Sequence, residues 1–117
     1  MKIFIICPVR NATKEIREKI NKHIKTLENC GYFVYYPARD TNQKDIIGLR
    51  ICQDNKKALI EADAIHLFWD GKSQGFLFDL GMAFALNKKV VPIMLPELTE
   101  NKSFQNMIAY WAAKENQ

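Results

Sequence analysis

One acidic residue of this chain stands in an unusually apolar stretch of sequence. The neighbours of Asp79 are mostly large and apolar, namely Phe76, Leu77, Phe78, Leu80, Met82 and Phe84. A carboxylate in such surroundings costs free energy unless it is paired or used, and the loss of water makes it more reactive. Asp79 is therefore a candidate nucleophile or general base. An acid near the start of a helix can also simply complement the helix dipole, and the residue types alone leave both interpretations open.

A polar turn containing glycine precedes this acid. Residues 64–69 form an apolar run that indicates a buried strand, and Ser73, Gln74 and Gly75 follow it just before the helix of Asp79. A hydroxyl, an amide and flexible backbone at the N-terminus of a helix favour an anion such as phosphate. A plain solvent-exposed turn has a similar composition. The chain contains neither GxGxxG nor GxxxxGK[ST], which excludes the common dinucleotide and P-loop sites.

Three further side chains are candidates for chemistry. Arg10 directly follows the first predicted strand, where it could hold a phosphate or a substrate hydroxyl, or be an ordinary surface arginine. We expect His66, inside a predicted strand, to be a satisfied core residue rather than a catalyst. His23 lies on a lysine-rich helix, where we expect it to face solvent. Clusters of His, Cys or acidic residues at metal-ligand spacing do not occur, so we expect no metal and no cofactor.

The composition predicts a single domain over residues 1–117. Of these residues 48% are hydrophobic and 26% are charged, as is ordinary for a soluble globular protein. The net charge of +4 comes from scattered lysines, without an RNA-binding aromatic motif or a basic tail. We therefore expect a small anionic ligand and no direct binding to nucleic acid.

Cysteines and apolar segments predict the compartment. Cys7, Cys30 and Cys52 are odd in number and form no CxxC pair, which indicates reduced thiols in a cytoplasmic protein. The apolar run over residues 3–7 is too short for a signal peptide. No stretch approaches the roughly 20 apolar residues that span a bilayer. We expect a cytoplasmic protein that does not associate with membranes.

The hydrophobic pattern predicts four strands that alternate with helices. The strands are expected at residues 2–7, 32–36, 64–69 and 90–95, and the helices from residue 13 to Gly31 and at residues 45–61, 76–86 and 103–114. Residues 38–45 are predicted to be a loop, and the inward positions of the second helix are expected to be Ile47, Ile51, Ala58 and Leu59. This order implies an α/β fold with a parallel sheet covered by helices on both faces. Ligands should then bind at the carboxyl ends of the strands.

Three segments resemble the nucleoside 2-deoxyribosyltransferase family, which includes the 2′-deoxynucleoside 5′-monophosphate N-glycosidases. They are NKKALIEAD at residues 55–63, GFLFDLG at residues 75–81 and ALNKKVV at residues 85–91. Residues 3–10 also resemble the first strand and loop of the family, so that the resemblance spans nearly the whole chain. It implies a flavodoxin-like three-layer αβα sandwich with a four- to five-stranded parallel sheet. It also implies a homodimer or higher homo-oligomer.

The activity that the resemblance implies is cleavage or transfer of the N-glycosidic bond of (deoxy)nucleosides or their 5′-monophosphates. In the family a glutamate attacks the anomeric carbon and forms a covalent sugar–enzyme intermediate, which water or a second base then releases. The matching residue here is Asp79, whose side chain is one methylene shorter. The family's second acid, which orients the sugar and the nucleophile, aligns with Asn55, and Asp54 lies one position earlier.

For this activity the expected substrate-binding residues are Pro8, Arg10, Trp69, Ser73, Gly75, Phe76 and Gln105. We expect Arg10, Ser73 and Gly75 to contact the sugar or phosphate, and Trp69 and Phe76 to offer apolar walls for the base. Pro8 stands where the monophosphate glycosidases place a phosphate-binding serine, whereas Ser73 and Arg10 match their second serine and their arginine. Gln105 matches a position that reaches into the site of a neighbouring subunit. The departures at Asp79 and Asn55 motivate an alternative, a nucleotide-binding or sensing module without catalysis on the same fold.

Overall fold

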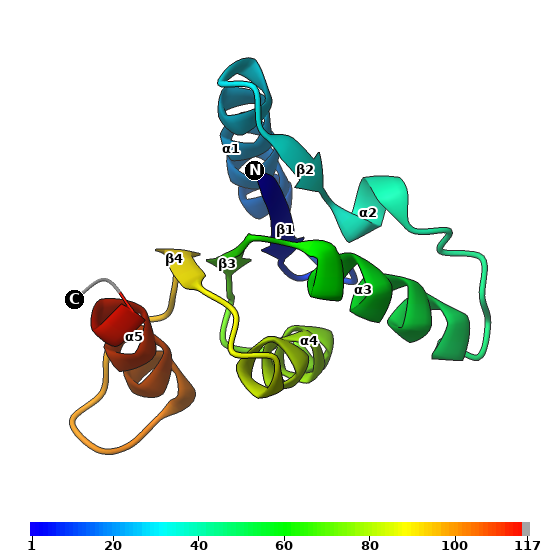
Figure 1. Cartoon of the computed structure of the whole chain (residues 1–117). Helices are drawn as coiled ribbons and strands as arrows, with labels where there is room; N and C mark the ends of the chain where they lie inside the picture. Colours follow the sequence, from blue (N-terminus) through cyan, green and yellow to red (C-terminus); the bar gives the residue numbers. More distant parts are fainter. Residues whose placement is uncertain (116–117) are drawn as a thin grey trace.

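Four parallel strands form one sheet, in the order β2-β1-β3-β4 (Figure 1). In this computed structural model, which describes residues 1–115, they are β1 (Lys2–Ile6), β2 (Phe33–Tyr35), β3 (Ala64–Phe68) and β4 (Val90–Met94). The two central strands, β1 and β3, are buried on both faces, as expected of parallel strands covered by helices. The strand order is that of the first four strands of a flavodoxin-like sheet, which confirms the predicted α/β class.

Helices cover both faces of the sheet and make the three predicted layers. They are α1 (Lys14–Asn29), α2 (Pro37–Asp40), α3 (Leu49–Glu61), α4 (Gln74–Ala85) and α5 (Phe104–Glu115). α1 packs on one face with Ile3 and Ile5, whereas α3, α4 and α5 share an apolar cluster with Phe4, Ile65 and Val90 on the other (Figure 1). None of these helices, in the part of the chain that the structure describes, is long and apolar enough to cross a membrane.

α1 forms where its spacing and end signals predict it. The Thr13 side chain accepts a hydrogen bond from the backbone N–H of Ile16 at 3.1 Å and so caps the N-terminus. Ile20, Ile24 and Leu27 recur at helical spacing and are buried against the sheet. The chain leaves the helix through Gly31, whose φ of 90° is the left-handed conformation that glycine adopts most easily.

α3 begins later than predicted, and the prediction that Ile47 faces inward is wrong. The Asp45 carboxylate accepts hydrogen bonds from the backbone N–H groups of Ile47 at 3.1 Å, Arg50 at 2.8 Å and Ile51 at 3.3 Å. Gly48 precedes the helix with a φ of 92°. Residues 45–48, which were predicted to begin the helix, therefore form a turn instead. This turn leaves the Ile47 side chain in solvent.

The short helix α2 lies inside the segment that was predicted to be a loop. Pro37 occupies its first turn, where a fixed φ and a missing N–H suit a helix start. A helix of four residues is too short to leave a periodic pattern in the sequence.

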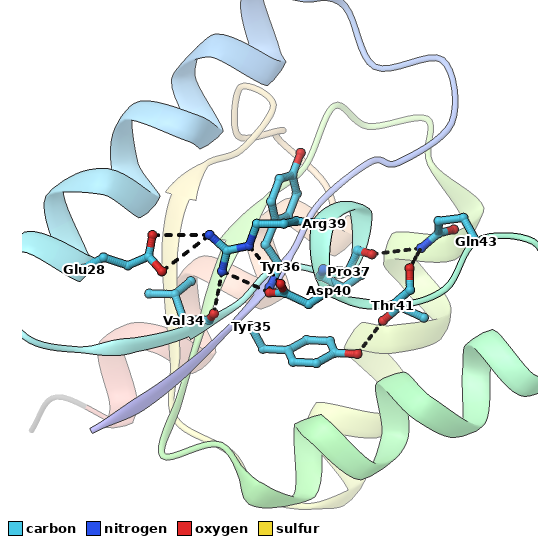
Figure 2. A network of polar contacts seen from close by, with 9 residues as sticks. All are labelled: Glu28, Val34, Tyr35, Tyr36, Pro37, Arg39, Asp40, Thr41 and Gln43. Carbon is cyan, nitrogen blue, oxygen red and sulfur yellow. Dashed lines mark hydrogen bonds and ion pairs between the residues drawn. The ribbon is translucent and has the colours of Figure 1, made fainter.

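α2 closes the open edge of the sheet at β2 (Figure 2). The Arg39 guanidinium donates to the backbone carbonyl of Val34 at 2.9 Å, and the Asp40 carboxylate accepts from the backbone N–H of Tyr36 at 2.8 Å. Arg39 also bonds the Asp40 carboxylate through Nε at 2.9 Å and pairs with Glu28 of α1 at 3.3 Å. Two side chains thus take the place of a neighbouring strand, which protects an edge that would otherwise pair with other chains.

Candidate functional site

α4 carries Asp79 to the carboxyl edge of the sheet. Phe76, Leu80 and Ala83 are its buried residues and pack the helix onto the sheet. By helical spacing Asp79 lies next to this buried stripe, and it is near enough to Cys52 of α3 for its charge to act on that thiol. The residues that pack α4 therefore also fix the direction of the carboxylate.

Burial sets the protonation behaviour of Asp79. Desolvation raises the pKa of its carboxyl from 3.8 to about 6. Among residues 1–115, no side chain or backbone group donates a hydrogen bond to this carboxylate or forms an ion pair with it. Above its pKa, Asp79 is a partly desolvated anion without a counter-charge, which is the state of a reactive carboxylate.

Two thiols lie near this carboxylate. Burial, with a smaller contribution from the charge of Asp79, raises the pKa of Cys7 to about 12. The same two causes, together with Asp45, raise the pKa of Cys52. Both thiols are therefore neutral at physiological pH and are poor nucleophiles. No three His, Cys, Asp or Glu side chains of the described chain gather closely enough to hold a metal ion.

The turn between β3 and α4 is held by its own side chains. The Asp70 carboxylate accepts from the backbone N–H of Ser73 at 2.9 Å, and Ser73 Oγ accepts from the N–H of Phe76 at 3.2 Å and caps α4. Gly71 has a φ of 80°, and a Cβ at this position would come within 3.1 Å of Pro96. The turn therefore lies against the loop that follows β4, and the Ser73 hydroxyl retains its own proton for a ligand.

Three aromatic side chains, from the end of β3, from α4 and from α5, pack together next to this turn. Trp69 and Phe76 are buried and stacked, with ring centroids 5.3 Å apart, and Phe104 of α5 meets Trp69 edge-on at 6.3 Å. The indole N–H of Trp69 is buried and has no hydrogen-bond partner in residues 1–115. An unsatisfied buried donor is uncommon. Its presence could not be predicted from the sequence, which shows only an aromatic residue at the end of a strand.

Neither predicted orienting residue is hydrogen-bonded to Asp79 within residues 1–115. Asn55 is buried, and its side-chain oxygen accepts from the Thr41 hydroxyl at 2.8 Å, which is itself hydrogen-bonded to Tyr35. Asp54 lines a separate groove of about 420 Å³ between β2 and α3. Desolvation is the cause of the raised pKa of Asp79, with no contribution from Asp54.

The remaining predicted residues lie in loops around the edge. Pro8 is buried two residues after β1, and Arg10 is exposed, with a guanidinium that has no partner in the described chain. Gly75 is exposed in the first turn of α4. Gln105 of α5 is half-buried and donates from Nε2 to the backbone carbonyl of Glu97 at 3.2 Å.

The two histidines form a pair outside this site. His23 Nε2 and His66 Nδ1 lie 2.8 Å apart, and the His23 ring also meets Phe68 edge-on at 5.4 Å. The prediction that His66 is a satisfied residue of the strand is confirmed. The prediction that His23 faces solvent is wrong, because α1 turns this residue toward β3.

Comparison with solved structures identifies the fold. A 2-deoxyribosyltransferase from the psychrotolerant bacterium Bacillus psychrosaccharolyticus superposes with a TM-score of 0.71 at 16% identity, over 100% of this chain and 92% of the other. The CMP N-glycosidase BcmB of Clostridium botulinum superposes with a TM-score of 0.63 at 20% identity, over 92% of this chain and 78% of the other. The chain has the fold of a 2-deoxyribosyltransferase.

Both neighbours are members of the nucleoside 2-deoxyribosyltransferase-like family, which the sequence also resembles. The chain matches no protein-family model and no curated protein sequence. At these identities the likeness concerns the fold, and the chemistry depends on the residues of this chain.

Proposed function

We propose that this protein cleaves or transfers the N-glycosidic bond of (deoxy)nucleosides or their 5′-monophosphates, with Asp79 as the nucleophile. The observation that carries the proposal is the Asp79 carboxylate, which is partly desolvated, free of partners in the described chain and located at the carboxyl edge of a parallel sheet. The resemblance in sequence and the fold shared with a 2-deoxyribosyltransferase and a CMP N-glycosidase support the choice of bond.

The reaction follows the two-step course of a retaining glycosidase. An oxygen of ionised Asp79 forms a bond to C1′ of the sugar while the bond from C1′ to the base nitrogen breaks. The base leaves with the electron pair and takes up a proton. Water, or a second base, then attacks C1′ and releases the carboxylate. Because the pKa of Asp79 is about 6, the carboxylate is in its attacking form at neutral pH.

Substrate-binding roles follow from the loops around Asp79. Arg10 and the free proton of the Ser73 hydroxyl are suited to a phosphate or a sugar hydroxyl, and the backbone at Gly75 leaves room for a close approach. Trp69 and Phe76 would form an apolar wall of the site that the base occupies. Pro8 and Gln105 belong to this set by resemblance alone.

Asp54 and Asn55 are proposed to orient the sugar and the nucleophile. In the structure Asn55 is engaged by Thr41, and Asp54 faces the groove beside β2. The Asn55 oxygen would have to leave the Thr41 hydroxyl to accept from the sugar, whereas its amide nitrogen makes no hydrogen bond within residues 1–115.

The test is incubation with a panel of deoxynucleosides and deoxynucleotides, with and without a free acceptor base, followed by chromatography. We expect released base, and no release above background by Asp79→Ala. Glu18→Gln on the exposed side of α1 is the matched control and should retain full activity. Activity of Asp79→Ala equal to that of the wild type would contradict the proposal.

A nucleotide-binding module without catalysis is the alternative. It is favoured by the shorter acid at position 79, since a misplacement of about 1 Å can lower a rate about 100-fold. The occupied side chain of Asn55 also favours it. Binding of a nucleotide in calorimetry, without base release after prolonged incubation, would select this alternative.

We also propose that the protein is a homodimer or a higher homo-oligomer, as the resemblance implies. Light scattering measures this directly.

A further inference from the structure

A chain of polar side chains connects β2 to α3 through the interior. The Tyr35 hydroxyl is hydrogen-bonded to the Thr41 hydroxyl, a contact drawn in Figure 2, and the Thr41 hydroxyl donates to Asn55 Oδ1 at 2.8 Å. Thr41 is only 5% exposed and Asn55 only 6%. Buried polar groups are costly when they lose their partners, so this chain of contacts holds its members in one arrangement.

The hydrogen bonds of this chain run in one direction. A hydroxyl has a single proton to donate, and Thr41 donates its proton to the Asn55 oxygen. The Thr41 oxygen therefore accepts from the Tyr35 hydroxyl. The oxygen end of the Asn55 amide is thereby occupied, and the two N–H groups at the other end are left to donate elsewhere.

Both ends of the contact between Tyr35 and Thr41 are anchored. The backbone N–H of Thr41 donates to the carbonyl of Pro37 at 3.0 Å. Gln43 Nε2 donates to the same carbonyl at 2.9 Å and to the Thr41 carbonyl at 3.4 Å, as Figure 2 shows. The Tyr35 ring is stacked on Phe4 of β1 with ring centroids 5.4 Å apart. The two hydroxyls are thus fixed in place before any ligand arrives.

The amide nitrogen of Asn55 faces an opening. It makes no hydrogen bond within residues 1–115, where Nε1 of Trp69 is the one buried side-chain polar atom without a partner. The Asn55 nitrogen is therefore not closed off, and it belongs to the 6% of this residue that solvent reaches. A deeply buried amide that presents only its N–H groups is a fixed hydrogen-bond donor for a ligand.

This opening lies on the side of α3 that faces α4. Asn55 and Leu59 are the buried residues of α3, four positions apart, and so share one face of the helix. Leu59 packs in the same apolar cluster as Leu80 of α4, which directly follows Asp79. The groove between β2 and α3 lies elsewhere, because Asp54 lines it and Asn55 does not.

We propose that Tyr35 and Thr41 are positioning residues, which hold Asn55 as a hydrogen-bond donor to a hydroxyl oxygen on the sugar ring of the substrate. The inference rests on the proposed function, and it names Asn55 rather than Asp54 as the residue that orients the sugar. A hydroxyl that accepts from the amide keeps its own proton for the carboxylate of Asp79. An acid at position 55 would compete for this proton and place a second negative charge nearby.

The test combines variants of this chain of contacts with substrates that differ by one hydroxyl. Cytidine, adenosine and their 5′-monophosphates are each compared with their 2′-deoxy and 3′-deoxy forms. The measured quantity is kcat/KM where the wild type releases base, and Kd from calorimetry where it only binds. Asn55→Ala and Thr41→Val should each lower kcat/KM or raise Kd about 5- to 10-fold on the ribose forms. On one deoxy form the loss should fall below about 2-fold, and that form identifies the hydroxyl.

Conservative variants separate positioning from packing. Thr41→Ser keeps the hydroxyl and should stay within about 2-fold of the wild type on every substrate. Tyr35→Phe keeps the ring and should show a loss of about 2- to 3-fold with the same dependence on the hydroxyl, and it tests the chain of contacts should Thr41→Val not fold. Tyr32→Phe, at a 39% exposed residue just before β2, is the matched control and should change nothing. Circular dichroism establishes that each variant is folded.

The outcomes distinguish this inference from the proposed function. Equal losses on all three sugars, or a folded Thr41→Val equal to the wild type, would overturn the inference, while base release by the wild type would still uphold the proposed function. Binding without base release, with losses that depend on one hydroxyl, would overturn the proposed function and uphold the role of Asn55. A wild type that neither binds nor cleaves any of these compounds would overturn both.

Discussion

At the scale of single residues, the clearest physical feature is the free-energy cost of Asp79. Burial raises the pKa of this carboxyl from 3.8 to about 6. Each pKa unit corresponds to about 1.4 kcal/mol, so holding Asp79 ionised at neutral pH lowers the stability of the fold by about 2–3 kcal/mol. Natural proteins keep such costs mainly where function requires the group.

Asp79→Asn is therefore expected to stabilise the protein while it abolishes base release. The amide has nearly the same shape and carries no charge, so the free energy of unfolding at pH 7.5 should rise by roughly 2 kcal/mol in urea denaturation. Glu18→Gln, an exposed acid-to-amide change, should leave it within about 0.5 kcal/mol of the wild type. An Asp79→Asn variant less stable than the wild type would mean that an unidentified partner satisfies the carboxylate.

The sequence predicted Asp79 but could not predict what its neighbours do. Asp79 was recognisable because the apolar residues around it are its close neighbours in the sequence. The hydrogen bond between Asn55 and Thr41 joins residues 14 positions apart, and the residues from 42 to 48 between them form no helix or strand. No local pattern shows that the Asn55 side chain is already occupied, or that Cys52 lies near the carboxylate.

At the scale of elements, strands and long helices were predictable because their signals are local and repeated. β1, β3 and β4 are apolar runs, and α1 repeats isoleucines at helical spacing between a threonine cap and a glycine. The errors lie where a single side chain overrides the pattern. The Asp45 carboxylate converts the expected first residues of α3 into a separate turn. Arg39 and Asp40 make the segment predicted to be a polar loop close the β2 edge.

Removal of the Arg39 side chain is expected to weaken this edge. Arg39→Ala leaves the buried carbonyl of Val34 without its donor, which costs about 1–3 kcal/mol of unfolding free energy. It also exposes the strand edge, so aggregation on heating should increase. Arg39→Lys keeps the charge but lacks the planar fork that bonds two groups at once, and it should lose about half as much.

Lys25→Ala is the control for this series. Lys25 is exposed on α1 and makes no side-chain hydrogen bond or ion pair within residues 1–115. Its removal should change the unfolding free energy by less than about 0.5 kcal/mol. Equal stability of Arg39→Ala and Lys25→Ala would show that water satisfies the Val34 carbonyl.

At the scale of the whole molecule, two half-buried titrating groups on opposite faces of the sheet, Asp79 and His66, act on stability in opposite directions. Desolvation, with the charges of His23 and Lys89, lowers the pKa of His66 from 6.5 to about 4. The folded state therefore binds fewer protons at His66 than the unfolded state does, and its stabilising contribution is lost as the pH falls from about 6.5 toward 4. The raised pKa of Asp79 has the opposite effect, because the folded state takes up its proton first and gains stability as the pH falls from about 6 toward 3.8.

The two contributions should partly offset each other in the wild type, because they act in opposite directions over nearly the same pH range. Unfolding free energies measured by urea between pH 7.5 and 4 should separate them. Relative to the wild type, Asp79→Asn should lose about 2–3 kcal/mol more on acidification, whereas His66→Gln should lose less, by a smaller amount because solvent screens the partly exposed imidazole. The curve of the double variant should fall between those of the two single variants, because the other carboxylates contribute equally in all four proteins. Parallel curves for the wild type and both single variants would show that neither group titrates as its burial requires.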